Sequence, residues 1–387
     1  MPKSLRVLFV ILIITSVLLL SLSATLIIAA KLGRTELIEA VAENVLPKLS
    51  GSSGSYQFSI PSGCLHEAHD PLTQVCARCG QTVCHDYVNG ICRCGKIAPL
   101  TSDYFDASLW VPCAHAGTVE TITYTTHDAY AAPQEAFTKS MEVYLPYGYN
   151  PSEKYNVLVL LHGNGGDEHY WFKARGYSYA DGYSPWEPFS TVLDNMIDRH
   201  LCKPVIVVSP TYYLTEEDRL SGNDLSRDST RMRYEVLQSI LPAVISRYST
   251  YAAGTGYSDM CAARDHFGFL GASYGGMIAC NAILTYDIDV FSWLATVSGI
   301  YANVPEMNKT WQILNFSDLP INYLYTSAGE NDTMREDTVS SYESLIGYSD
   351  KITSSNCCYV DVAAAEHEER VWDNAVYNCL MLFFAGV

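Results

Sequence analysis

The sequence has little positive charge. It holds 24 Lys and Arg against 42 Asp and Glu among 387 residues, and its formal net charge is −18. No cluster of basic residues is present to contact a phosphate backbone, which excludes nucleic acid as a partner. Only 17% of the residues are charged while 48% are apolar, so global disorder is excluded as well. The length suggests roughly two or three structural units.

Charged residues are absent from positions 7 to 30, near the N-terminus. A helix of this length spans about 36 Å, more than the roughly 30 Å of a hydrocarbon core. Lys3 and Arg6 precede the run, but no clean A-x-A cleavage motif lies near Ala30. An uncleaved signal anchor over residues 1–34 is therefore favoured over a cleavable signal peptide. Either one places the rest of the chain outside the cytoplasm, anchored to the membrane at the cell surface or secreted.

Residues 35–61 are predicted to form a short amphipathic stalk helix followed by a flexible linker that contains GSSGS. The next segment, residues 62–97, holds six of the 13 cysteines. It repeats a Cys/His pair, a close cysteine pair and a glycine. The candidate ligands are Cys64, His66, Cys76 and Cys79 in the first half, and Cys84, His85, Cys92 and Cys94 in the second.

Four such ligands in each half suit tetrahedral Zn²⁺ and leave no open position for catalysis. We therefore predict a structural, zinc-ribbon-like module. A small disulfide-linked module, which is natural outside the cell, is the alternative.

Residues 98–387 alternate apolar runs with helical patterns, which is typical of an α/β domain. Strands are expected at Thr118–Tyr124, Ser140–Leu145, Val157–Leu161, Val205–Ser209, His266–Leu270, Trp293–Val297, Ile321–Thr326 and Cys358–Val362. Helices are expected at Arg231–Ile245, Gly275–Leu284 and Arg370–Phe384. Several strands are continuous apolar runs, as central strands covered on both faces require.

The sequence GFLGASYGG contains a G-x-S-x-G motif centred on Ser273. An apolar strand precedes it and a helical pattern follows, which is the strand–turn–helix context of a nucleophile elbow. The hydroxyl of Ser273 would then stand at the head of a helix, where the N–H of Tyr274 can donate to a developing oxyanion. The alternative for Ser273 is a helix N-cap.

A nucleophilic serine needs a histidine base, and the base needs an acid to orient it. In the fold that carries such an elbow, acid and histidine follow two later strands in that order. The loop after Ile321–Thr326 offers Asp332, with Glu330 as the alternative acid. The loop after Cys358–Val362 offers His367, the only histidine beyond the elbow. The alternatives are a helix-capping Asp332 and a solvated His367.

The loop after Val157–Leu161 should supply the second oxyanion donor. Its HGNGG sequence makes the N–H of Asn164 the first candidate and that of Gly165 the second, while His162 is interpreted as a structural brace. Two aromatic residues nearby, Trp171 and Tyr212, are predicted to contact the substrate. Packing in the core is the alternative for both.

These segments together resemble the feruloyl esterase branch of carbohydrate esterase family one, in the esterase-D-like group of α/β hydrolases. The matching pieces are VYLPYGYNPSEKYNVLVLLHGNGGDEHYWF, GFLGASYGG, YLYTSAGEND and EHEERVWDNAVYNCL, within about Gly117–Phe384. The resemblance implies a mostly parallel central sheet with helices on both faces. It also implies Ser273 as nucleophile, His367 as general base and Asp332 as its partner, with no cofactor for catalysis. Tyr274 stands where many relatives have methionine.

We therefore expect an extracellular serine carboxylesterase that acts through an acyl-enzyme on feruloyl or acetyl esters of plant-wall polysaccharide. Its partner would be a small-molecule or polysaccharide ester. An acyltransferase on the same scaffold and a non-catalytic surface carbohydrate-binding protein are the alternatives, because the fold alone does not fix the function.

Overall fold

The computed structural model describes residues 107–128, 135–174, 187–221 and 231–384, with Leu100 and Phe105. It also describes the backbone of two short antiparallel strands, β1 (Tyr87–Val88) and β2 (Ile91–Cys92). The predicted membrane segment, the stalk and linker, and the side chains of the Cys/His module lie outside the described residues. Within the described part of the chain, no helix is both long and apolar enough to cross a bilayer.

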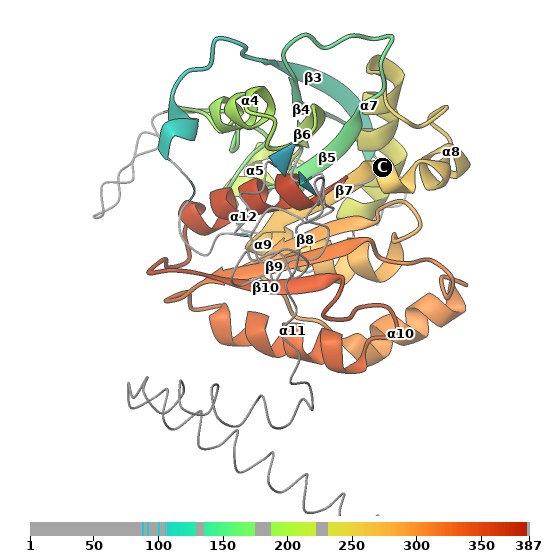
Figure 1. Cartoon of the computed structure of the whole chain (residues 1–387). Helices are drawn as coiled ribbons and strands as arrows, with labels where there is room; N and C mark the ends of the chain where they lie inside the picture. Colours follow the sequence, from blue (N-terminus) through green and yellow to red (C-terminus); the bar gives the residue numbers. More distant parts are fainter. Residues whose placement is uncertain are drawn as a thin grey trace, which may run out of the picture. The chain divides into compact units, whose positions relative to one another are not determined.

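Eight strands form one sheet in the order β10-β9-β8-β7-β5-β6-β4-β3 (Figure 1). Their bounds are β3 Thr118–His127, β4 Ala136–Leu145, β5 Asn156–Leu161, β6 Val205–Ser209, β7 Phe267–Ala272, β8 Trp293–Val297, β9 Tyr323–Gly329 and β10 Cys357–Val362. The strands from β10 to β6 are parallel, and β4 pairs antiparallel with both β6 and β3. Every expected strand is therefore present, with ends shifted by a few residues.

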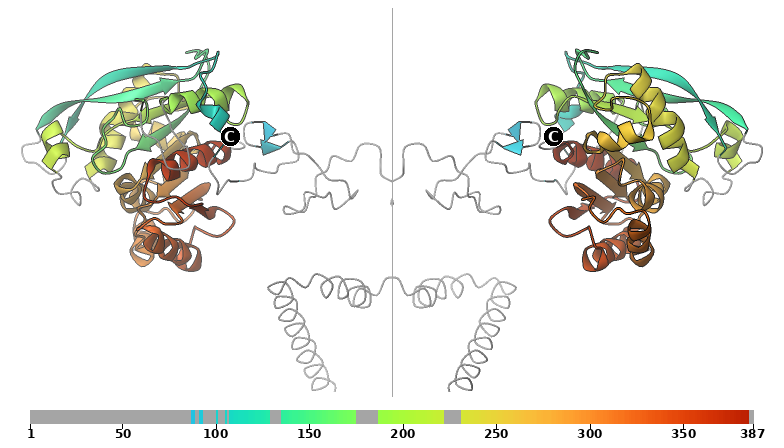
Figure 2. Two further views of the ribbon diagram at one scale, coloured as in Figure 1. Left: turned by 90° about the vertical axis from the view of Figure 1, so that its left-hand side faces the viewer. Right: turned by 90° about the vertical axis from the view of Figure 1, so that its right-hand side faces the viewer.

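Burial explains why the central strands can be predicted from the sequence. Every residue of β5, β6 and β7 is buried, because helices cover both faces of the sheet there. The edge strand β3 instead alternates buried and exposed residues along its second half. Figure 2 shows the long β3–β4 pair running along one edge of the sheet.

Helices pack on the two faces of the sheet and form two apolar cores. One core includes residues of η2 (Val236–Ile240), α7 (Leu241–Arg247), α8 (Tyr257–Ala262), α9 (Tyr274–Ile278), η4 (Ala279–Leu284), α10 (Val304–Ile313) and α11 (Arg335–Tyr348). The other includes residues of η1 (Ala107–Trp110), α4 (Ser190–Asp198) and α12 (Glu369–Leu382). The remaining short elements are α5 (Glu216–Ser221) and η3 (Arg264–His266). This is the expected α/β-hydrolase fold, and each of the three predicted helices is present.

The parallel strands end along the same edge of the sheet, so the loops that follow them meet there. The loop after β5 begins at His162, Ser273 directly follows β7, and Asp332 and His367 follow β9 and β10. The topology therefore brings four segments that are distant in the sequence to one place.

Candidate active site

Ser273 occupies a strained turn between β7 and α9. Its φ of 53° and ψ of −119° lie in a region that residues with a side chain rarely adopt. Backbone hydrogen bonds hold this conformation, because the Ser273 N–H donates to the carbonyl of Val297 at 2.7 Å and its own carbonyl accepts from the Gly276 N–H at 2.8 Å. The turn thus fixes the direction in which the hydroxyl points.

The two glycines of the motif let the turn approach its neighbours. A Cβ on Gly271 would lie 1.9 Å from the carbonyl oxygen of Gly275, and one on Gly275 would lie 2.6 Å from that of His162. Neither separation is tolerable, so both positions require glycine. The second contact also sets the loop after β5 directly against the elbow.

The side chains of Ser273, His367 and Asp332 form a connected chain of hydrogen bonds. The Ser273 hydroxyl lies 2.9 Å from His367 Nε2, and His367 Nδ1 lies 2.9 Å from Asp332 Oδ1. The imidazole also packs edge-on against Trp372, with ring centroids 5.7 Å apart. The ring is thus held on three sides in the orientation that proton transfer from the serine requires.

Asp332 is buried and ionised. Burial alone would raise the pKa of its carboxyl, but the hydrogen bonds from His367 and the Met334 amide, together with the nearby Ser298 hydroxyl, outweigh burial and lower the pKa below its ordinary value. The Met334 N–H donates to Oδ1 at 2.7 Å. A buried carboxylate held charged in this way favours the Nδ1–H tautomer of His367 and leaves Nε2 as the acceptor for the serine proton.

Glu330, the alternative acid, has a different contact. It is exposed, and its Oε2 accepts a hydrogen bond from the N–H of Ala364 at 3.0 Å. Glu330 therefore braces the loop that carries His367, and the structure brings Asp332 to the imidazole.

The loop after β5 lies beside Ser273, as the oxyanion prediction requires. A Cβ built on Gly163 would lie 3.0 Å from the Cβ of Ser273. The N–H of Gly165 is already bound, because it donates to the hydroxyl of Tyr213 at 3.0 Å. The N–H of Asn164 is therefore the candidate oxyanion donor from this loop. The N–H of Tyr274, at the start of α9, is the other candidate donor.

His162 is a buried brace. Its Nδ1 lies 2.7 Å from the carbonyl of Gly163 and its Nε2 lies 2.9 Å from the hydroxyl of Thr211. Complete burial lowers the pKa of His162 to about 4, so the ring is neutral and cannot serve as a second charged group.

The two predicted substrate-contact residues need correction, because neither has exposed surface. Trp171 packs edge-on against Tyr170 and Phe189 in the core. Tyr212 is buried beneath residues 162–168, the loop after β5 and hereafter the oxyanion loop, where its hydroxyl donates to the carbonyl of Gly163 at 3.0 Å. Both side chains are structural in this conformation.

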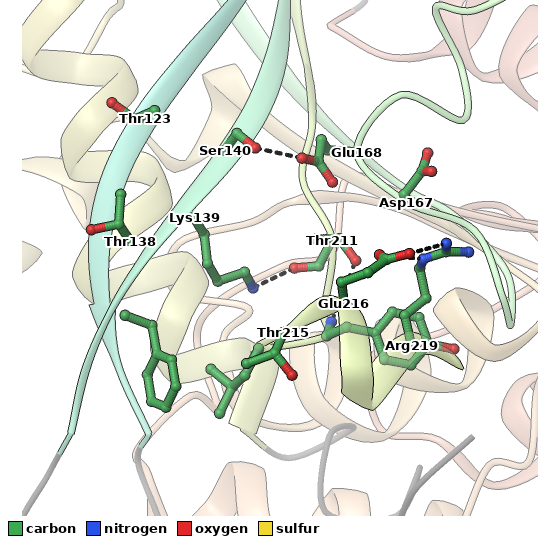
Figure 3. Close-up of a pocket in the computed structure, with 13 residues that line it drawn as sticks. Thr123, Thr138, Lys139, Ser140, Asp167, Glu168, Thr211, Thr215, Glu216 and Arg219 are labelled. Atoms are coloured by element: carbon green, nitrogen blue, oxygen red, sulfur yellow. Dashed lines mark hydrogen bonds and ion pairs between the residues drawn. The ribbon is translucent and has the colours of Figure 1, made fainter. Parts of the chain in front are cut away.

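A pocket of about 450 Å³, which the sequence did not predict, lies next to the end of the loop after β5 (Figure 3), and Ser273, His367 and Asp332 are not among the residues that line it. Its walls come from β3, β4, the end of the loop after β5, the segment that follows β6, and α5, and most of the lining residues carry polar side chains. Lys139 is buried in this wall and donates to Thr211 and Glu235. The charged residues that line it are Lys139, Asp167, Glu168, Glu216 and Arg219. No sequence signal marks this pocket, because its walls join segments that are far apart in the chain.

No group of three or more His, Cys, Asp or Glu that could hold a metal ion is found in the part of the chain that the structure describes. All eight predicted zinc ligands fall outside it, apart from the backbone of Cys92 in β2. The zinc prediction is therefore still a prediction.

The chain is similar to known proteins in both sequence and structure. The model of a family described as "Putative esterase" matches residues 138–351. Endo-1,4-beta-xylanase Y of Acetivibrio thermocellus is 28% identical over 284 residues, which cover 70% of this chain and 24% of that protein. The chain thus spans about a quarter of the length of this curated relative.

Two solved structures share the fold. The feruloyl esterase module from Clostridium thermocellum, a mutant complexed with sinapinate, has a TM-score of 0.60 and 25% identity, and the match covers 73% of this chain and 94% of that one. A ferulic acid esterase from the anaerobic fungus Anaeromyces mucronatus has a TM-score of 0.54 and 16% identity, with coverage of 74% and 98%.

Proposed function

The chain belongs to the Esterase family, and from this premise we propose that it is an extracellular serine carboxylesterase acting on feruloyl or acetyl esters of plant-wall polysaccharide. The resemblance to feruloyl esterases seen in the sequence is confirmed by the relatives found. The observation that carries the proposed mechanism is the chain of hydrogen bonds from Ser273 through His367 to Asp332.

The reaction follows from this geometry. His367 Nε2 accepts the proton of Ser273 as the serine oxygen attacks the ester carbonyl. The N–H groups of Asn164 and Tyr274 stabilise the oxyanion that forms, and His367 then returns the proton to the departing alcohol. Water, activated by the same imidazole, releases the acid from the acyl-enzyme. Asp332 keeps the imidazole in the tautomer that these steps need.

Two observations support the substrate class. One relative is a xylanase, and one structural neighbour holds sinapinate, a hydroxycinnamate. Both observations favour an aromatic or acetyl ester of a sugar.

The decisive experiment compares wild-type enzyme with Ser273→Ala on methyl ferulate, acetylated xylan and short aryl esters. We expect Ser273→Ala to lose several orders of magnitude in kcat, as removal of the nucleophile does in other triads. Ser246→Ala, which alters an exposed serine of α7, is the matched control. Wild-type turnover by Ser273→Ala would exclude the mechanism, and the panel identifies the acyl group.

Two other functions remain open to test. An acyltransferase would use the same acyl-enzyme, and a sugar acceptor added to the assay would then yield a new ester instead of free acid. A non-catalytic carbohydrate-binding protein would fail to react with a fluorophosphonate at Ser273. Stoichiometric labelling of Ser273 supports the enzyme, because only an activated serine reacts with this probe.

We propose two further roles for residues 1–97, the first quarter of the chain. Residues 1–34 would act as a signal anchor or signal peptide that places the esterase outside the cell or at its surface. The Cys/His module would hold structural zinc with no part in catalysis. Fractionation of the full chain between membrane and medium tests the first proposal.

A further inference from the structure

Two consecutive tyrosines after β6 lie beneath the oxyanion loop and bind its backbone. Tyr212 donates to the carbonyl of Gly163 at 3.0 Å. Tyr213, which is 2% exposed, makes two contacts to the next residues of the loop. Its hydroxyl donates to Asn164 Oδ1 at 2.7 Å and accepts from the N–H of Gly165 at 3.0 Å.

These two bonds use the Tyr213 hydroxyl as both donor and acceptor. A phenol has one proton to give, and the Asn164 amide oxygen is a fitting acceptor for it. The Gly165 N–H occupies a lone pair of the same oxygen. One hydroxyl thus fixes the side chain of one loop residue and the backbone of the next.

The opposite side of Gly165 is held as well. Arg219 of α5 donates to the carbonyl of Gly165 at 2.9 Å, and its guanidinium is paired with Glu216, as Figure 3 shows. Gly165 has a φ of 78°, and a Cβ built on it would meet no atom within 4 Å. Its left-handed conformation is held by the hydrogen bonds at its N–H and its carbonyl.

We propose that Tyr213 is a positioning residue for catalysis, which withdraws the Gly165 N–H and orients the loop so that the N–H of Asn164 serves the oxyanion. This inference rests on the proposed function. It decides between the two donors that the sequence left open, because a backbone N–H bound to a phenol oxygen is not available to the substrate. Tyr213 itself does not touch the reacting atoms.

The test removes only the hydroxyl, with Tyr213→Phe. Displacing an oxyanion donor weakens the binding of the transition state more than the binding of the substrate. We therefore expect kcat for an aryl ester to fall about tenfold or more while KM changes little. The affinity for an aryl trifluoromethyl ketone, which forms a tetrahedral adduct with the serine, should fall in parallel. The control is Tyr155→Phe, whose hydroxyl accepts from the Asn150 N–H in a turn away from the site.

A double-mutant cycle with Asn164→Ala separates positioning from loss of fold. Alanine keeps the backbone N–H of residue 164 but removes the oxygen that Tyr213 binds. We expect the effect of Tyr213→Phe on kcat to shrink in the Asn164→Ala background, because the contact of the Tyr213 hydroxyl with Asn164 Oδ1 is already lost there and only its contact with the Gly165 N–H remains to be removed. Thermal unfolding of each variant checks that the fold persists.

Three results would overturn the inference: wild-type kcat in Tyr213→Phe, a loss in KM alone, or fully additive effects in the cycle. Each can occur while Ser273→Ala is inactive, and would then refute the role of Tyr213 and leave the esterase mechanism intact. Activity in Ser273→Ala would instead refute the proposed function.

Discussion

At the scale of the residue, two carboxylates compete for the role of the acid. Asp332 is buried and bonded to His367, whereas Glu330 is exposed and bonded to a backbone amide. Asp332→Asn keeps the shape but favours the wrong histidine tautomer, so we expect kcat to fall by about 10³- to 10⁴-fold. Glu330→Gln is the matched control and should stay near wild type. Steady-state kinetics of both variants on one aryl ester would settle the choice, and equal losses would contradict it.

The residues that form the hydrogen-bonded chain could be predicted because their loops follow known strands in a known order. The aromatic residues could not. Trp171 and Tyr212 lie in the segments that follow β5 and β6, at the edge of the sheet where the site forms, so sequence position favours a substrate contact. Their burial depends on partners such as Phe189 at the start of α4, which local sequence does not place. The role proposed for Tyr213 could not be predicted either, because it comes from two hydrogen bonds to residues of a distant loop.

His162 predicts a pH dependence of stability. Its pKa falls from 6.5 to about 4 on folding because the ring is fully buried. Between those values the unfolded chain binds a proton that the folded chain does not, so stability decreases as the pH drops from 6.5 to 4, by about 3 kcal/mol in total.

His162→Asn removes this titration. We expect the variant to be less stable than the wild type at pH 7, with the difference narrowing toward pH 4. Urea unfolding of both proteins across this range measures it, and carboxylates common to both cancel in the comparison. A difference that stays constant with pH would show that His162 titrates normally in the folded protein.

At the scale of the element, strands were easier to predict than helices. Every residue of β5, β6 and β7 is buried, and such runs are visible as continuous apolar stretches. Helix α11 has no such signal. Only Thr338, Ser341 and Leu345 of its 14 residues are buried, and two of these carry hydroxyls, so no apolar stripe marks the helix in the sequence.

Replacing glycine by alanine is expected to have opposite effects on stability at Gly271, beside the turn between β7 and α9, and at Gly347 in α11. Gly271→Ala would place a Cβ 1.9 Å from the carbonyl oxygen of Gly275, so the elbow must shift. We expect a loss of about 3 kcal/mol or more in the free energy of unfolding, together with the activity. Gly347→Ala in α11 meets no atom within 4 Å and should stabilise the protein by about 0.5–1 kcal/mol. Denaturant unfolding compares them, and similar values would contradict the steric argument.

At the scale of the whole molecule, the proposed chemistry and the cysteines of residues 62–97 lie in separate stretches of the chain. The proposed nucleophile, base, acid and oxyanion donors all belong to the sheet domain, between Asn164 and His367. The seven cysteines in the described part of the chain are all free thiols. The remaining six of the 13 are those between Cys64 and Cys94.

Zinc and disulfides in residues 62–97 therefore predict different numbers of reactive thiols in the unfolded chain. If residues 62–97 hold zinc through thiolates, then unfolding the full chain with a chelator, without reductant, should expose all 13 cysteines to a thiol reagent. If they form disulfides, only the seven thiols of the sheet domain should react. We expect 13, with zinc released in the same experiment. In the folded enzyme a chelator should leave ester hydrolysis unchanged, because every proposed step uses a side chain or N–H of the sheet domain. A loss of kcat in proportion to zinc release would contradict this separation.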